Sequence, residues 1–238
     1  MNGHPIVVTL RKKIEALSKE AKASSTYVRT GDIRRVVRSI NRDLITLSVE
    51  ERLDLAEHLY TNPAWKCSMC ATHILSISVP EIEKHHLPHI CKFSIHFDDW
   101  GKVDDFGTTV LNQLIEKFPD EILQMIHEWN HSENMWERRL SMVAFTRKIG
   151  KSGKYTDECL ELAENLIDDP EDLVQKAVGW ALKDTMRGDK DRVLAYVKNL
   201  RIRGKSAVIT LYAIRDLKGK EREEVLALKS KKKKRKKP

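Results

Sequence analysis

Hydrophobic residues recur along most of the chain at the three- and four-residue spacing of an amphipathic helix. The stretch 121–130 is an example, with apolar residues at Ile122, Leu123, Met125, Ile126 and Trp129. No convincing pair of strands is present. The pattern predicts helices near 6–23, 31–43, 48–61, 65–77, 81–96, 100–117, 120–131, 135–149, 156–167, 171–186, 190–199 and 206–228.

Helix start signals support several of these ranges. Ser48 and Glu51 have the spacing of a capping box, and Asn134 directly precedes an apolar-periodic run. The sequence Asp169-Pro170-Glu171 predicts an N-cap followed by a proline in the first turn. Each signal marks the expected N-terminus of a helix.

A weak internal period relates three of the predicted helices. They begin near Trp100, Trp136 and Leu173, about 36 or 37 residues apart. Each is followed by a second helix, and two-helix units of this length are typical of repeat proteins that stack into a curved surface. We therefore predict an all-α, HEAT-like (ARM/HEAT superhelix) α-α solenoid, with residues 1–228 as one domain. An irregular helical bundle is the alternative.

The net charge of +8 is located in a short segment at the end of the chain. Residues 229–238 carry eight Lys and Arg side chains, so residues 1–228 are net neutral. We expect this Lys-rich tail to be disordered and able to attract phosphate backbones; a solubilising tail is the alternative. Within the body, 134–154 has six basic residues and one acid, whereas 156–172 has eight acids and no Lys or Arg. Such separation favours a surface that attracts polyanions.

The remaining composition narrows the class of protein. No apolar run of 18 residues and no secretory signal pattern occur, which favours a cytoplasmic protein, nucleoid-associated if bacterial, without membrane contact. Four dispersed cysteines fit free thiols in a reducing compartment. The sequence has no phosphate-cradling glycine loop and no convincing nucleophilic triad.

Trp180 lies outside the expected core stripe of its helix. That stripe consists of Val174, Ala177, Val178 and Ala181. Trp180 shares the outer face with Lys176 and Lys183, at positions i−4 and i+3. An indole between two lysines suits contact with sugar and phosphate; packing against a neighbouring helix, with the lysine stems along it, is the alternative.

Trp100 and Asp104 also share one helix face, because they are four residues apart. A carboxylate beside an aromatic wall can stabilise a positively charged ribose in a transition state and can activate water. Asp105 lies about 100° further round and does not join the pair. The structural alternative is a first-turn aspartate that complements the helix dipole beside a packed tryptophan.

Arg139 lies about a quarter turn from the apolar stripe of helix 135–149. Such an edge position lets a guanidinium reach phosphate. An arginine that covers the edge of the core is an equally good interpretation.

A competing interpretation is zinc binding by Cys67, Cys70 and His73. They are followed by more donors, namely His85, His86, His89 and Cys91. The first three, however, spread around the axis of a predicted helix, and no second Cys-x-x-Cys is present. We therefore expect no metal.

Four separated blocks resemble the AlkD family of DNA alkylation-repair enzymes. They are Tyr27-Val28-Arg29-Thr30-Gly31-Asp32-Ile33-Arg34-Arg35-Val36, Asp99-Trp100-Gly101-Lys102-Val103-Asp104, Asn134-Met135-Trp136-Glu137-Arg138-Arg139 and Val174-Gln175-Lys176-Ala177-Val178-Gly179-Trp180-Ala181-Leu182. Where the family has two adjacent aromatics, this chain has Asp99-Trp100.

The resemblance implies a stack of HEAT-like helix pairs whose concave face binds duplex DNA. It implies a glycosylase that removes N3- and N7-alkylated purines without base flipping and without a cofactor. It also implies that Trp100 and Trp180 flank the lesion nucleotide and that Asp104 is the catalytic carboxylate. Arg139, and with it Arg138, Lys176 and Lys183, are then expected to bind DNA, with the four principal side chains meeting in one groove. We expect a monomer. The alternative function is a non-catalytic repeat scaffold that binds DNA or protein.

Overall fold

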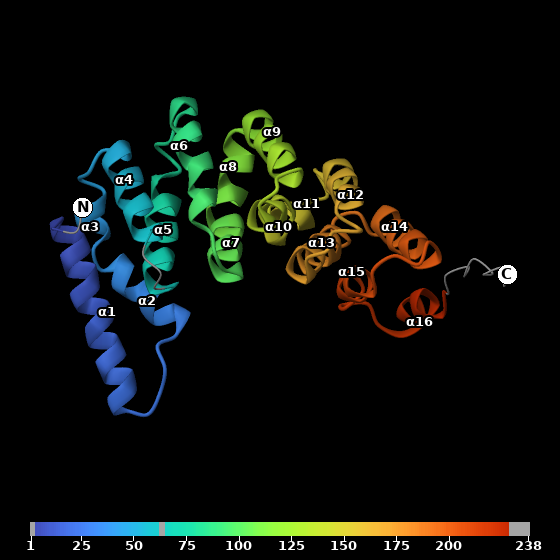
Figure 1. The fold of residues 1–238 in the computed structure, drawn as a ribbon, viewed down its shortest axis with the longest axis horizontal. Helices are drawn as coiled ribbons and strands as arrows, with labels where there is room; N and C mark the ends of the chain where they lie inside the picture. The colour runs from blue at the N-terminus through green and yellow to red at the C-terminus, as the bar shows by residue number, and fades with distance from the viewer. Residues whose placement is uncertain (1–2, 62–64, 229–238) are drawn as a thin grey trace. The chain divides into compact units, whose positions relative to one another are not determined.

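The protein is all-α in the residues that the structure describes, which are 3–61 and 65–228 of this computed structural model (Figure 1). No strand occurs in those ranges, so the prediction of an all-helical fold is confirmed. The chain divides into two compact units, Met1–Phe118 and Pro119–Pro238. The Lys-rich tail predicted over 229–238 lies outside the described residues.

The first unit runs from blue to green in Figure 1. Its elements are α1 (Pro5–Ala23), α2 (Thr30–Arg38), α3 (Asn41–Leu44), α4 (Val49–Tyr60), α5 (Trp65–Ser78), the 3-10 turn η1 (Lys84–His86), α6 (Leu87–Cys91), η2 (Lys92–His96), α7 (Trp100–Phe106), the π-helical turn η3 (Gly107–Leu111) and α8 (Asn112–Lys117). α5 packs against α2, α4 and α7. It is therefore the central helix of this unit.

An aromatic cluster fills the core of the first unit. The ring of Tyr60 lies 5.7 Å from Phe93 and 5.4 Å from Phe97, and its hydroxyl is 2.8 Å from the hydroxyl of Thr72. Because a buried phenol needs a hydrogen-bond partner, Thr72 lets α4 place a tyrosine in the interior.

The second unit consists of α9 (Pro119–Asn130), α10 (Met135–Val143), α11 (Arg147–Ser152), α12 (Thr156–Asn165), α13 (Asp172–Thr185), α14 (Lys190–Ile202), α15 (Ala207–Ala213) and α16 (Gly219–Ala227). α10, α13 and α15 pack in succession, while α9, α12 and α14 pack beside them as partners of helix pairs. This arrangement is the stacking of the α-α solenoid class, as predicted. The expected core stripe of α13 is completely buried.

Two of the three predicted helix starts are confirmed. The Ser48 hydroxyl accepts from the Glu51 N–H at 3.2 Å and the Glu51 carboxylate accepts from the Ser48 N–H at 2.8 Å. Asn134 caps α10 by accepting from the N–H of Trp136. The third start is wrong, because α13 begins at Asp172 and Asp169 lies before it.

Several predicted helices are interrupted in the structure. The range 31–43 divides into α2 and α3. The range 81–96 forms η1, α6 and η2, because Pro88 has no N–H for a continuous helix and instead lies in the first turn of α6. The range 135–149 divides before Arg147, whose φ of 55° is left-handed. The range 206–228 divides into α15 and α16, and Gly219 adopts a φ of 56° where α16 begins.

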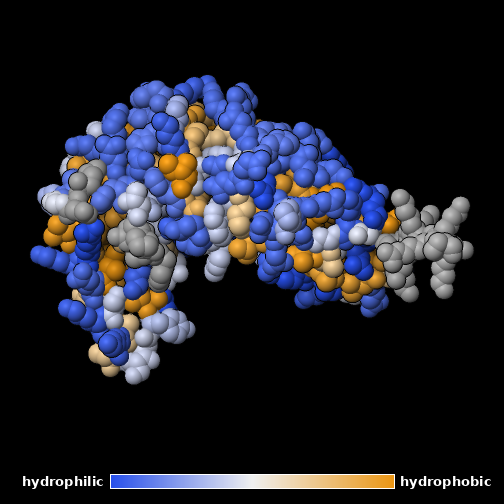
Figure 2. Space-filling model, in the orientation of Figure 1, coloured by the Kyte–Doolittle hydropathy of each residue, from blue (hydrophilic) through white to orange (hydrophobic). Residues whose placement is uncertain are grey.

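The surface is largely polar. Figure 2 shows that the visible face of each unit is mainly hydrophilic, with hydrophobic residues only in patches. No helix among the described residues is long and apolar enough to cross a membrane.

Gly150 allows α11 to approach the end of α13 closely. A Cβ at this position would overlap the carbonyl oxygen of Phe145 and lie 3.0 Å from backbone atoms of Asp184 and Thr185. Because these are backbone atoms, they cannot move aside as a flexible side chain would.

We therefore expect Gly150→Ala to lower the free energy of unfolding by about 1–3 kcal/mol, the usual cost of overpacking. Gly31→Ala is the control, because its Cβ would meet nothing within 4 Å. It should leave stability unchanged or raise it by less than about 1 kcal/mol. Urea unfolding of both variants measures the difference, and equal midpoints would show that the close approach is unimportant.

Candidate functional site

Asp99 and Trp100 form the start of α7. The Asp99 carboxylate accepts from the backbone N–H groups of Gly101 at 2.6 Å and Lys102 at 3.1 Å, and so caps the helix. Trp100 is the first residue of α7, and 60% of its surface is exposed. An aspartate at the position before Trp100 thus begins the helix that presents an indole to solvent.

Asp104 follows one turn later on the same helix. It is partly buried, and its backbone carbonyl accepts from the hydroxyl of Thr108 at 2.7 Å. At four residues' separation its side chain leaves α7 on the same face as Trp100.

Asp105 has a different environment. Its carboxylate lies 3.4 Å from the guanidinium of Arg34 on α2. Burial raises the pKa of Asp105 above its ordinary value of 3.8, and hydrogen bonding to Thr72 and the charge of Arg34 oppose part of this rise. The neighbouring carboxylates of α7 are therefore distinct, one beside Trp100 and one tied to α2.

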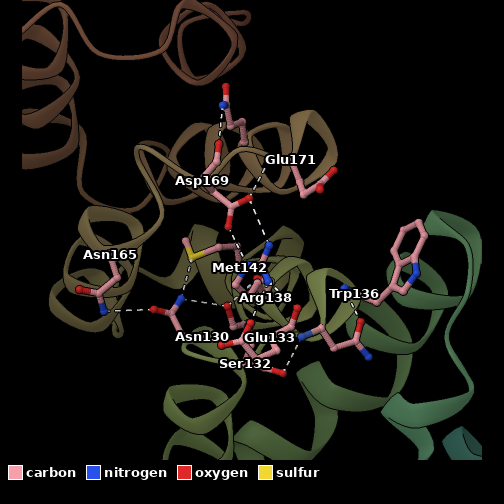
Figure 3. Close-up of polar contacts among 12 residues, drawn as sticks. Asn130, Ser132, Glu133, Trp136, Arg138, Met142, Asn165, Asp169 and Glu171 are labelled. Carbon is pink, nitrogen blue, oxygen red and sulfur yellow. Dashed lines mark hydrogen bonds and ion pairs between the residues drawn. The ribbon is translucent and has the colours of Figure 1, made fainter.

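Arg138, predicted to bind DNA, is part of a partly buried polar network in the second unit (Figure 3). Its Nε donates to Asp169 Oδ2 at 2.7 Å, and its Nη1 donates to the carbonyls of Ser132 at 2.9 Å and Glu133 at 3.0 Å. Asp169 also accepts from the N–H of Glu171 at 2.9 Å. This pair therefore joins α10 to the segment before α13.

Arg139 and Lys183, also predicted to bind DNA, are buried. Arg139 is 5% exposed and its Nη1 donates to the carbonyl of Leu173, because α13 covers the side of α10 where Arg139 lies. Lys183 is 7% exposed, with its Nζ 3.2 Å from Asp184 Oδ1. These positions are less accessible than the helix pattern indicates, and direct contact of Arg138, Arg139 and Lys183 with DNA stays a prediction.

Lys176 and Trp180 lie closer to the surface of α13. Lys176 is exposed and forms an ion pair with Asp172 at 2.5 Å. Trp180 is partly buried, and its indole Nε1 donates to Asp184 Oδ2 at 2.8 Å. The tryptophan is therefore held in one orientation by a carboxylate one turn further along the helix.

Asp184 and Arg147 extend this arrangement and were missed in the sequence. The backbone N–H of Arg147 donates to Asp184 Oδ2 at 2.8 Å, and the guanidinium of Arg147 lies 5.6 Å from the centre of the Trp180 ring. The i, i+4 spacing of Trp180 and Asp184 was a usable signal. For Arg147 the signal was only its place in the basic segment 134–154, because the predicted helix continued through it.

The left-handed backbone of Arg147 carries an energetic cost. Such a conformation costs a non-glycine residue about 1–2 kcal/mol. The hydrogen bond to the buried Asp184 carboxylate offsets this cost, since a charge-assisted bond is stronger than a neutral one.

The residues of the proposed zinc site do not form a metal centre in the described part of the chain. Cys67 and Cys70 are buried, and burial raises the pKa of both thiols. His73 Nε2 lies 3.0 Å from Asn41 Oδ1.

Only Glu50, His85 and His86 bring three ligand atoms together among the described residues. There, His86 Nδ1 accepts from the N–H of Glu83 at 2.9 Å, which places the proton of the neutral ring on the Nε2 that faces Glu50. A metal would need the Nε2 lone pair, so these three residues do not fit a metal ion.

The fold defines an all-α protein of the α-α solenoid class. Residues 12–217 match the family model described as DNA alkylation repair enzyme. Because this match includes most of the chain, the protein belongs to that family, as the four sequence blocks indicated.

A solved structure supports the fold. It is described as a predicted DNA alkylation repair enzyme from Enterococcus faecalis, and it matches with a TM-score of 0.69 over 85% of this chain and 95% of that chain. The sequences are 15% identical, so this similarity concerns the fold alone. No curated protein matches the sequence.

The environment of Asp105 can be tested by its titration. We expect its carboxyl group to titrate above 3.8, because burial disfavours the ionised form. Arg34→Ala should raise the pKa further, since it removes the positive charge that favours ionisation. Carboxyl carbon chemical shifts followed against pH measure both values; a midpoint at or below 3.8 in the wild-type protein would contradict this description.

Proposed function

We propose that the protein is a DNA glycosylase that hydrolyses the N-glycosidic bond of N3- and N7-alkylated, cationic purines in duplex DNA, without flipping the base. The observation that carries the proposal is the exposed indole of Trp100 with Asp104 one turn further along α7. Membership of the DNA alkylation repair family supports it by limiting the chemistry to repair of alkylated DNA.

The reaction suits a site with few catalytic groups. An alkylated purine already carries a positive charge, so it leaves as a neutral base and needs little acid catalysis. The difficult part is the positive charge that develops on the deoxyribose. The Asp104 carboxylate stabilises this charge, and it accepts a proton from the water whose oxygen bonds to C1′.

The tryptophans supply aromatic surfaces for the DNA backbone. Trp100 offers an exposed indole from the first unit, and Trp180 offers a partly buried one from the second unit. Lys176 supplies a cation on the same helix as Trp180, and its ion pair with Asp172 is exposed enough to exchange for a phosphate. Because Arg138 and Arg139 donate to protein groups and Lys183 is ion-paired with Asp184, the proposal does not depend on their contact with DNA.

Excision of a methylated base tests this assignment. Wild-type protein should release 7-methylguanine from methylated duplex DNA, and Asp104→Asn should lower the single-turnover rate by roughly 100-fold or more, because the amide carries no charge and is a poor base. Asp43→Asn is the matched control, since it makes the same change at an exposed position of α3. Its rate should equal that of the wild-type protein.

The result separates the candidate functions. If neither wild-type protein nor Asp104→Asn releases base while both bind duplex DNA, the protein is a non-catalytic scaffold and the glycosylase proposal is wrong. If Asp104→Asn and Asp43→Asn excise equally well, Asp104 is not the catalytic carboxylate.

A further inference from the structure

The buried carboxylate of Asp184 connects several side chains of the second unit. Its side chain is only 4% exposed. Oδ2 accepts from the indole of Trp180 and from the backbone of Arg147, both at 2.8 Å. Oδ1 forms no aligned hydrogen bond, but it lies 3.2 Å from Lys183 Nζ and 3.2 Å from Arg187 Nη1, within ion-pair distance. One carboxylate thus orients an aromatic ring and three basic residues.

Arg147 is the basic residue of this group that is best placed to meet a ligand. Its side chain is exposed, whereas Lys183 is buried and Arg187 is ion-paired with Asp216 as well as with Asp184. Its backbone is fixed by the bond to Asp184, and its guanidinium lies beside the ring of Trp180. The contact of Gly150 with the backbone of Asp184 holds α11 in the same place.

The charge around Arg147 suits an anion. α11 also carries Lys148 and Lys151, both exposed, and no acidic residue. The negative charge of Asp184 lies below the surface and is balanced by Lys183 and Arg187. α11 itself therefore offers an anion three exposed basic side chains and no carboxylate.

An indole with a guanidinium over its ring matches the repeating chemistry of a nucleic acid strand. The flat ring offers an apolar wall to a sugar, and the guanidinium offers several N–H donors to the adjacent phosphate. We propose that Arg147, positioned by Asp184, binds a backbone phosphate of duplex DNA beside Trp180. This inference deepens the proposed function and rests on it for the identity of the ligand.

Salt dependence of DNA binding tests the role of Arg147. Fluorescence anisotropy with an undamaged labelled duplex gives the affinity at several salt concentrations. Arg147→Ala should bind more weakly, with the slope of log K against log salt reduced in magnitude by about 1. Arg192→Ala is the matched control, because it removes an exposed arginine of α14 that pairs with Asp157. It should keep the wild-type slope, and equal slopes for the two variants would overturn the proposal.

A second variant tests positioning by Asp184. Asp184→Asn removes a negative charge, so electrostatics alone predicts tighter DNA binding. Our proposal predicts weaker binding, together with a shift of the indole ¹H–¹⁵N resonance of Trp180, because Trp180 and Arg147 lose their charged acceptor. Tighter binding with an unshifted resonance would overturn it.

If Asp184→Asn does not fold, Trp180→Phe tests the same positioning. This variant removes the indole N–H that donates to Asp184 but keeps an aromatic ring, and it should bind duplex DNA more weakly than the wild-type protein. An unchanged affinity for DNA would contradict the need for an indole held by Asp184.

Failure of this inference is distinguishable from failure of the glycosylase assignment. Wild-type protein that excises 7-methylguanine, with equal slopes for Arg147→Ala and Arg192→Ala, overturns only the role of Arg147. Wild-type protein that binds DNA through Arg147 but releases no base overturns only the enzymatic proposal. A wild-type protein that binds no duplex overturns both.

Discussion

A charged side chain that is removed from water needs an opposite charge or hydrogen-bonding partners, and this constraint recurs at several places in the protein. In the first unit, Arg52 is completely buried and forms two hydrogen bonds with Glu81, at 2.9 and 2.8 Å. In the second unit Arg138 meets Asp169, and Lys183 meets Asp184. The pairs of Arg52 and Arg138 connect segments that are 29 and 31 residues apart in the sequence, whereas Lys183 and Asp184 are neighbours on α13. A basic side chain that is buried against such a partner is not accessible to a ligand, so the same constraint separates the buried basic residues from the exposed ones.

Asp184 shows how packing and a binding surface become linked. The carboxylate that balances Lys183 inside the protein also holds the indole of Trp180 and the backbone of Arg147 near the surface. A ring whose N–H is already bonded has few alternative orientations, and such preorganisation lowers the entropy lost when a ligand binds. The hydrogen bond to Asp184 therefore limits the orientations of Trp180 before a ligand binds.

The repeated helix pairs were visible in the sequence because each helix buries a stripe of defined spacing. Val174, Ala177, Val178 and Ala181 were identified as the core side of α13, and all are buried. Pro88 was a visible reason for the interruption in 81–96. The break before Arg147 had no such signal, because it depends on a hydrogen bond to Asp184, 37 residues further along the chain.

The amino-acid sequence alone determined the helical class, the family and the shared helix face of Trp100 and Asp104, because helix periodicity, caps and motif blocks are local properties. It also placed Trp180 away from the core stripe. Only the tertiary structure decided that Arg139 and Lys183 are buried and that Arg147 is exposed beside Trp180. The reason is physical: one helix shows which side chains lie off its own apolar stripe, but only the neighbouring helices determine which of them are covered.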